Sequence, residues 1–121
     1  MRGGGGGSDQ LQQQFLYLTT TGWKTGRQHR IEIWFVEHDN KRYYVMSELR
    51  ERAHWVQNIV HNPRVSFRVS NDAFEGIARI VDKRKEPGLA AEVSKLMGAK
   101  YGWDQGLIVE LACSNSVSSA S

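Results

Sequence analysis

Residues 19–30 read TTTGWKTGRQHR, a hydroxyl-rich segment that leads into a glycine-bracketed turn and a cluster of basic side chains. The flanking residues, FLYL before it and IEIWFV after it, are aromatic or branched, which favours two strands joined by this turn. Gly22 and Gly26 allow positive φ and close approach of the backbone to a ligand. Lys24, Arg27 and Arg30 add cationic donors. The turn is a candidate anion site, and an ordinary solvated hairpin turn is the alternative.

Composition limits the class of protein. A chain of 121 residues forms one domain, and its 16 basic against 13 acidic residues give a net charge of +3. That excess is too small to predict nucleic-acid binding without a clustered stripe, but it suits an anionic small molecule. One cysteine, Cys113, excludes an internal disulfide framework and fits a reducing compartment, and no apolar run reaches the roughly 20 residues of a membrane helix. We therefore expect a cytoplasmic protein without stable membrane insertion.

Three regions follow from the composition along the chain. Residues 1–9 contain five consecutive glycines and are expected to be a flexible leader. Residues 10–113 form the predicted domain, and residues 114–121 form a serine-rich tail without core residues.

The first half of the domain predicts a three-stranded meander and a helix. Residues 15–18 and 31–36 carry bulk on both faces, which favours strands buried on both sides, and residues 42–47 form a third strand. A helical period then begins at Leu49 and stops before Pro63. Arg50 and Arg52 near its start indicate an anion there, or ion pairs with neighbouring glutamates.

The second half predicts a hairpin, a helix and a last strand. Residues 65–69 and 73–82 flank an Asn-Asp turn, and Gly76 leaves room for a bulge or an approaching ligand. A helix begins at Pro87 and ends near residues 98–102, and residues 106–111 form the last strand. The fold class is therefore mainly β with two helices, a barrel of about six mostly antiparallel strands with helices at its openings. Such a barrel is too narrow for a large ligand, which predicts a site between two protomers of a homodimer.

Five segments together resemble the deazaflavin (F420)-dependent nitroreductase family of the flavin-binding split β-barrels, the group that includes pyridoxamine-phosphate oxidase. The resemblance spans residues 15–111 and rests on LTTTGWKTG (18–26), RIEIWF (30–35), YVMS (44–47), RAHWVQNI (52–59) and HNPRV (61–65). It implies a homodimeric split barrel that binds F420, or FMN in related members, along the dimer groove.

The resemblance also implies roles for individual residues. Lys24, Arg30 and Arg52 would meet the cofactor phosphate or acidic tail, and Met46 and Ser47 would lie along the ring or ribityl chain. The strand through Glu32, Ile33 and Trp34 would contact the ring edge. The remaining matches to the family motifs are Thr25, Trp55 and Asn58, of which the last two either touch cofactor or hold the helix on the barrel.

Two departures from the family pattern bear on the cofactor. Trp23 stands where many relatives carry a basic residue, and a bulky, partly acidic segment at residues 48–51 replaces a glycine-rich loop. Both changes leave FMN as an alternative to F420.

The resulting hypothesis is an oxidoreductase that uses reduced F420 to transfer hydride to a small quinone-like or nitro-compound-like acceptor. Tyr101 and Trp103 are candidates for the substrate wall, with ordinary packing as the alternative. No side chain is expected to be catalytic in its own right, because the cofactor supplies the chemistry. No metal is expected, because the four histidines lack a ligand spacing with carboxylates or Cys113. The alternatives are an FMN-binding oxidoreductase, and a non-catalytic module for a flavin, haem or lipid-like ligand.

Overall fold

The computed structural model describes residues 15–38 and 42–116, so the predictions for residues 1–9 and 117–121 lie outside the described part. Its elements in chain order are β1 (Phe15–Thr21), β2 (Gln28–Glu37), β3 (Arg42–Ser47), the 3-10 turn η2 (Arg50–Arg52), α2 (His54–His61), β4 (Arg64–Val69), β5 (Asp72–Ile80), α3 (Pro87–Tyr101) and β6 (Leu107–Ser116).

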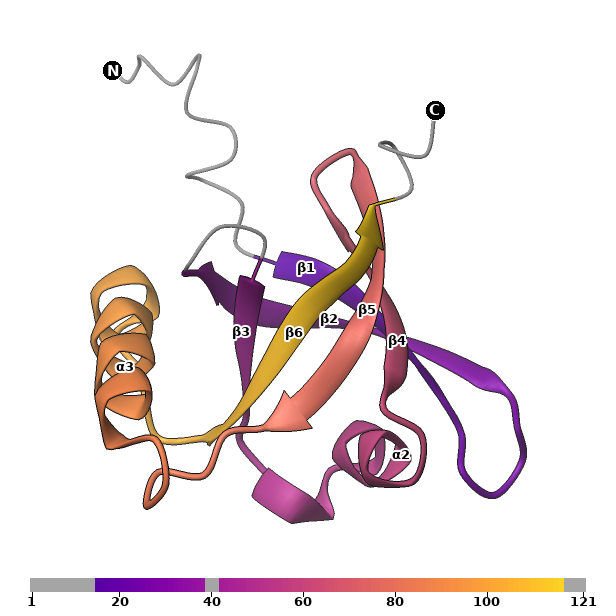
Figure 1. Cartoon of the computed structure of the whole chain (residues 1–121), viewed down its shortest axis with the longest axis horizontal. Coiled ribbons are helices and arrows are strands. Elements are labelled where there is room, and N and C mark those ends of the chain that lie inside the picture. Colours follow the sequence, from indigo (N-terminus) through magenta and orange to yellow (C-terminus); the bar gives the residue numbers. More distant parts are fainter. Residues whose placement is uncertain (1–14, 39–41, 117–121) are drawn as a thin grey trace.

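The described strands close into a barrel in the order β1-β2-β3-β6-β5-β4, and the pairing of β1 with β4 completes the ring (Figure 1). Every recorded pair is antiparallel. This confirms the prediction of a mainly β fold with two helices and six antiparallel strands. Residues Leu16 and Leu18 face Ile33 and Ile31 across the β1–β2 ladder, so all four side chains point to the barrel interior.

The interior is a single apolar cluster to which all six strands contribute. Tyr43, Phe67 and Phe74 contact one another ring to ring, with centroid separations of 5.4 to 5.8 Å. Each fully buried apolar side chain of this kind contributes about 1.5–3 kcal/mol relative to exposure. The filled interior leaves no room for a large ligand, so a site must lie at the margin of the barrel.

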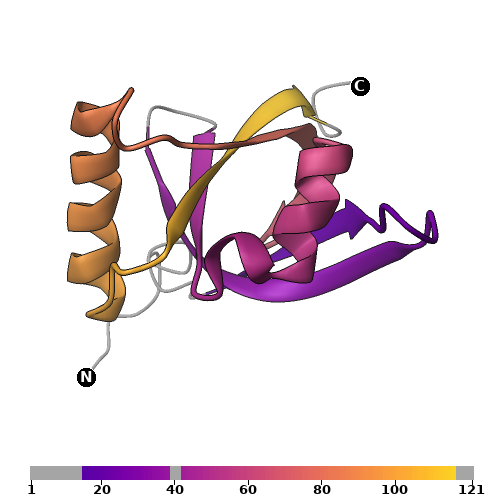
Figure 2. The same ribbon diagram turned by 90° about the horizontal axis from the view of Figure 1, so that it is seen from below.

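The two helices occupy different places, and only α2 covers an opening as predicted (Figures 1 and 2). Helix α3 packs instead on the outer face of β3 and β6, against Tyr44, Met46 and Ile108. The reason is that β3 is apolar on both faces: Tyr43 and Val45 point inward, and Tyr44 and Met46 point outward and need a cover.

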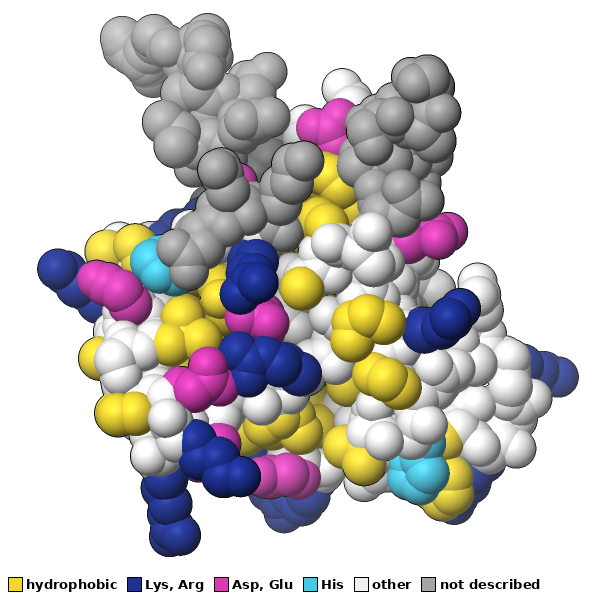
Figure 3. Space-filling model, in the orientation of Figure 1, with side chains coloured by type: hydrophobic (Ala, Val, Ile, Leu, Met, Phe, Trp, Pro, Cys, Tyr) yellow, Lys and Arg dark blue, Asp and Glu magenta, His cyan; other side chains and the backbone are white. Residues whose placement is uncertain are grey.

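A buried carboxylate anchors the amino end of α3 to the barrel. Glu110 is 4% exposed and accepts hydrogen bonds from the Tyr44 hydroxyl and from Arg79 Nε, both at 2.9 Å. Arg79 also pairs with Glu86 beside the start of α3, and this hydrogen bond lowers the pKa of the Glu86 carboxyl. Charges of both signs intermix on this face of the molecule (Figure 3), which is typical of an ion-pair network rather than of a basic stripe.

The structure corrects three details of the sequence interpretation. β1 is not buried on both faces, because Phe15 and Tyr17 on its outer side are 41% and 37% exposed. The helix expected from Leu49 is interrupted: η2 comes first, Ala53 is extended at φ −65° and ψ 137°, and α2 begins only at His54. Strand β6 continues to Ser116, beyond the predicted end of the last strand at residue 111.

The expected bulge at Gly76 is confirmed. The β5–β6 register shifts between Glu75 and Gly76, and a Cβ at Gly76 would overlap the carbonyl oxygen of Ala112. Glycine at this position therefore lets two backbones approach closely.

None of the helices in residues 15–38 and 42–116 is long and apolar enough to span a membrane.

Candidate functional site

The barrel is split along one edge of β2. The β2–β3 ladder is recorded only from Phe35 to Glu37, whereas β2 pairs with β1 all the way from Gln28 to Trp34. Strand β3 pairs with β6 along its whole length, and its last residues, Met46 and Ser47, have no recorded partner in β2. Among residues 15–38 and 42–116, the amino-terminal part of β2 therefore has one paired edge and one edge without a strand partner.

Two hydrogen bonds show which backbone groups lie on the open edge. The His38 N–H donates to the Arg42 carbonyl at 3.0 Å, so even-numbered residues of β2 direct their backbone groups toward β3. Phe35 directs its own groups the opposite way, because its N–H and C=O both bond to the Tyr101 hydroxyl. The N–H and C=O groups of Glu32 and Trp34 consequently face the side where β3 has departed.

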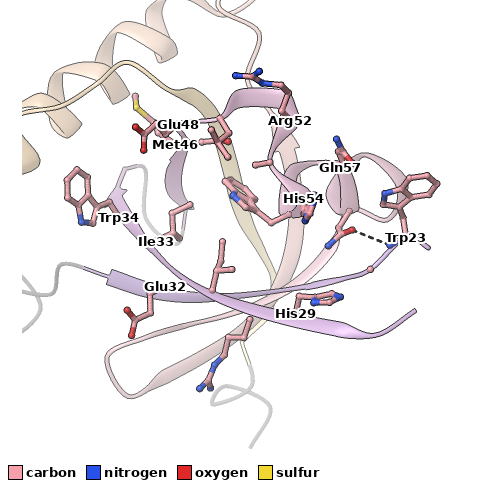
Figure 4. A pocket seen from close by; sticks show the side chains of 18 of the residues that line it. Trp23, His29, Glu32, Ile33, Trp34, Met46, Glu48, Arg52, His54 and Gln57 are labelled. Carbon is pink, nitrogen blue, oxygen red and sulfur yellow. Dashed lines mark hydrogen bonds between the residues drawn. The ribbon is translucent and has the colours of Figure 1, made fainter. Parts of the chain in front are cut away.

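A cleft of about 1180 Å³ follows this open edge (Figure 4). Its walls come from β2, the end of β3, the segment through η2, and α2. All four tryptophans of the chain line it: Trp23, Trp34, Trp55 and Trp103. Figure 4 shows Trp34 and Trp23 at opposite ends, with His54 between them.

Twelve of the thirteen residues that the sequence proposed as a site surround this cleft. They are Lys24, Thr25, Arg30, Glu32, Ile33, Trp34, Met46, Ser47, Arg52, Trp55, Asn58 and Trp103. Tyr101 is the exception, and it lies behind Trp34 with the two rings stacked at 4.5 Å between centroids and 5° between planes.

The end of the cleft near the β1–β2 turn is polar and cationic. Trp23 stacks on His61 at 4.2 Å and 9°, and Lys24 Nζ lies 5.0 Å from the Trp23 ring centroid. The backbone N–H of Trp23 donates to Asn58 Oδ1 at 3.2 Å, and Asn58 Nδ2 donates to Thr20 Oγ1 at 3.0 Å. The buried Asn58 amide thus joins α2 to both the strand and the turn.

The amino end of α2 also opens on the cleft. Ala53, His54 and Trp55 line the cleft, and no side chain of the described residues caps the helix. The first N–H groups of a helix have no intrahelical acceptor and carry a partial positive charge. With Arg52 beside them, these groups form a second cationic feature of the cleft, whose lining also includes the acidic Glu48 and Glu32.

Two of the predicted cofactor residues, Arg30 and Ser47, contact other side chains or backbone of the protein. Arg30 lies on the outer face of β2, with its guanidinium carbon 5.0 Å from the Tyr17 ring, and it also borders a smaller hollow of about 200 Å³. The Ser47 hydroxyl donates to the Arg50 carbonyl at 2.9 Å and holds Arg50 at φ 55°. Ser47 therefore also fixes the segment that leads to Arg52.

The Trp34 end is aromatic. Trp103 meets Trp34 edge to face at 6.2 Å, and the Tyr101 hydroxyl donates to the Phe35 carbonyl at 2.8 Å. Lys100 Nζ donates to the same carbonyl at 3.0 Å. Burial raises the pKa of the Tyr101 hydroxyl and lowers the pKa of the Lys100 ammonium.

Several cleft residues were missed at the sequence level. His29 and Ile31 share the inward face of β2 with Ile33, so strand alternation was the signal that could have found them. His54 and Gln57 line the cleft from α2, but their place depends on the break at Ala53, which the helical period did not reveal. Among the described residues, no three His, Cys, Asp or Glu side chains come together as a metal site.

Solved structures share this fold. The chain resembles the heme storage protein HutZ from Vibrio cholerae, with a TM-score of 0.70, 19% identity, and coverage of 88% of this chain and 85% of that one. A conserved hypothetical protein from Mycobacterium tuberculosis matches with a TM-score of 0.71 and 19% identity, over 87% of this chain and 76% of that one. An F420-H2 dependent reductase, FDR-A, matches with a TM-score of 0.56 and 23% identity, over 81% and 93%.

The closed barrel with one unpaired strand edge over a large cleft defines a split-barrel protein with room for a cofactor. The model of the F420H(2)-dependent quinone reductase family matches residues 1–106, and the chain belongs to that family. It is an F420-dependent oxidoreductase, which confirms the predicted enzyme class and cofactor. No curated protein matches the sequence.

Proposed function

We propose that the cleft along β2 binds F420 together with a small planar acceptor, a quinone or a nitro compound, and that the protein catalyses reduction of this acceptor. The observation that carries the proposal is the open edge of β2, where the backbone groups of Glu32 and Trp34 face a cleft lined by all four tryptophans. When bound, reduced F420 supplies the hydride. The protein supplies binding, orientation and exclusion of water.

The residues of the cleft fit this cofactor. F420 combines a flat heterocycle with a ribityl chain, a phosphate and an acidic tail, so it needs an apolar slot with hydrogen-bonding groups on one edge and cations at a distance. The cleft volume of about 1180 Å³ exceeds the roughly 300–1,000 Å³ of a drug-sized site. Ile33, Met46 and Trp55 give apolar surface, and Lys24 and Arg52 lie on the rim.

Charge orients the cofactor in this proposal. The phosphate and acidic tail lie toward Lys24, Thr25, Arg52 and the amino end of α2, where cations and free helix N–H groups gather. The ring then lies along residues 32–34, beside Met46 and Ser47, and the acceptor lies between the ring and the Trp34 and Trp103 side chains. Arg30 would join the phosphate site by turning from Tyr17 around the edge of β2.

Trp55 and Asn58 have different roles in this proposal. Trp55 lines the cleft and packs against the barrel core, so it is a wall for the ring. Asn58 is 6% exposed and its amide is engaged by Thr20 and Trp23, so it acts mainly by holding α2 in place.

We also propose that the protein is a homodimer whose second copy covers the outer face of β1 and β2. Phe15, Tyr17 and Trp34 lie together on this face and are each at least 37% exposed, and Phe15 and Trp34 also line the cleft. Apolar side chains clustered beside a site are typical of an interface. Light scattering should report a dimer, and Tyr17→Glu should shift it toward monomer; a wild-type monomer at micromolar concentration would contradict this part.

The experiment that tests the proposed function is a parallel titration of cofactor-free protein with F420 and FMN, followed by tryptophan fluorescence. Because all four tryptophans line the cleft, a bound ring should quench a large part of the emission. We expect tighter binding of F420, and oxidation of reduced F420 by a two-ring naphthoquinone or a nitroaromatic compound. Tighter FMN binding, or binding of neither, would overturn the proposal.

A further inference from the structure

Tyr101 is the one predicted substrate residue that does not line the cleft, yet it contacts the wall of the cleft at two points. Its ring lies parallel to the Trp34 indole, with 4.5 Å between centroids and 5° between planes. Trp34 itself is 37% exposed and lines the cleft, as does Trp103, which approaches the indole edge to face at 6.2 Å. Tyr101 therefore supports one face of an exposed ring that belongs to the site.

The Tyr101 hydroxyl makes the second contact, with the backbone of the next residue in β2. It accepts a hydrogen bond from the Phe35 N–H at 3.0 Å and donates one to the Phe35 carbonyl at 2.8 Å. The recorded β1 ladder ends at the pair of Phe15 with Trp34, so Phe35 lies just beyond it. The last turn of α3 thus supplies a hydrogen-bond partner for both backbone groups of Phe35.

These contacts restrain both the β2 backbone and the rotation of the Trp34 side chain, which together decide where the indole lies. The hydroxyl holds the backbone on the paired edge of β2, which leaves the groups of Trp34 directed to the cleft. The ring contact restricts rotation of the Trp34 side chain, because parallel offset rings lose favourable contact when one of them turns.

We propose that Tyr101 is a positioning residue for the acceptor: it holds the Trp34 ring as a flat wall against which a planar acceptor ring docks. The inference rests on the proposed function for the identity of the ligand. It assigns acceptor selection to the carboxyl end of α3, and cofactor affinity to the opposite end of the cleft.

The test compares Tyr101→Phe and Tyr101→Leu with Tyr44→Phe. The phenylalanine variant keeps the ring and loses both hydrogen bonds, and the leucine variant loses ring and hydroxyl. Tyr44→Phe is the matched control, because the Tyr44 hydroxyl also makes a buried hydrogen bond, of 2.9 Å to Glu110, on the side of the molecule covered by α3. Amide exchange of Phe35, near-ultraviolet circular dichroism and naphthoquinone affinity are measured for each.

We expect the Phe35 amide to exchange about tenfold faster in both Tyr101 variants, as loss of one hydrogen bond predicts. The Tyr101→Leu protein should also lose near-ultraviolet tryptophan signal and bind a two-ring naphthoquinone about 2- to 10-fold more weakly, the size of one aromatic contact. Tyr101→Phe should retain most of that affinity. F420 affinity should fall less than naphthoquinone affinity in Tyr101→Leu, and should stay unchanged in Tyr44→Phe.

Unchanged naphthoquinone affinity in Tyr101→Leu would overturn the proposal, and so would an equal loss in Tyr44→Phe. A wild-type protein that binds no naphthoquinone overturns it as well. Quinone affinity is an equilibrium measurement that needs no turnover. A wild-type protein that binds naphthoquinone without transferring hydride would therefore contradict only the proposed function.

Discussion

Trp23 and Trp34 stand at opposite ends of one cleft, and each stacks on a second ring, but the chain holds them in different ways (Figure 4). Trp23 sits in a turn and is held by its backbone N–H, which donates to the buried Asn58 amide. Trp34 sits in a strand and is held by the Tyr101 ring and by hydrogen bonds to its neighbour Phe35.

The difference separates two kinds of recognition. The Trp23 end gathers Lys24, the start of α2 and polar side chains, so it suits the charged part of a ligand. The Trp34 end gathers aromatic rings and no described cation that lines the cleft beside them, so it suits a flat apolar ring. A single cleft can thus bind an anionic cofactor at one end and select an acceptor at the other.

Substitution of Asn58 should cause the largest loss of stability, because its amide connects the Trp23 end of the cleft to the barrel. Asn58→Leu leaves the Trp23 N–H and the buried Thr20 hydroxyl without their partners, at a cost of about 2–4 kcal/mol in the free energy of unfolding. Urea unfolding measures this loss. Gln57→Leu, one position earlier on α2 and half-buried, is the control and should change stability by less than about 0.5 kcal/mol. Equal losses in both would refute the anchoring role.

Lys24→Ala should weaken F420 binding by about 1–3 kcal/mol, roughly 5- to 150-fold in Kd, because a charged hydrogen bond to phosphate or carboxylate is lost. Fluorescence titration measures the loss, which should shrink at high salt. Arg27→Ala is the matched control, since Arg27 belongs to the same turn but does not line the cleft. Acceptor affinity should be unaffected in both variants. A Lys24→Ala protein with unchanged affinity would place the anionic groups elsewhere.

Replacing a glycine by a larger residue should have opposite effects on stability in the β1–β2 turn and in α3. Gly26 in the turn has φ +75°, so Gly26→Val forces a branched residue into the left-handed region at about 1–2 kcal/mol. Gly98 lies inside α3 with open space where an added methyl group would point, so Gly98→Ala should stabilise the protein by about 0.5–1 kcal/mol. Thermal and urea unfolding test both. A neutral Gly26→Val protein would show that the turn adapts without strain.

The sequence was most informative where the determinants are contiguous. The turn at residues 19–30, the bulge at Gly76 and the end of α3 before Gly102 each depend on residues a few positions apart, and each lies where it was expected. Of the two turn glycines that could adopt positive φ, Gly26 does so, at +75°, and Gly22 does not.

Features that depend on distant pairing were not predictable in the same way. The stack of Tyr101 on Trp34 requires α3 to lie along the outer face of β3, and the sequence placed that helix at an opening of the barrel. The Arg30 guanidinium lies over Tyr17 at the margin of the cleft, because strand alternation puts both residues on the outer face. The register of β2 decides both outcomes, and a one-residue shift would reverse them.

The change of stability at alkaline pH should be the smallest effect. Part of it should come from Tyr101, which lies beside the Trp34 end of the cleft. Burial raises the pKa of Tyr43 to about 12 and also raises that of Tyr101, so the folded protein keeps protons that the unfolded chain loses above its ordinary value of 10.0. Their contribution to stability is complete below pH 10.0 and is lost as the pH rises through the folded pKa values. Lys100 acts in the opposite sense, because its lowered pKa makes the folded state gain stability as the pH approaches 10.5. Urea unfolding from about pH 9 to about pH 12 should show the decline, and Tyr101→Phe should make it shallower. An identical slope in that variant would mean that the Tyr101 hydroxyl titrates alike in the folded and unfolded chains.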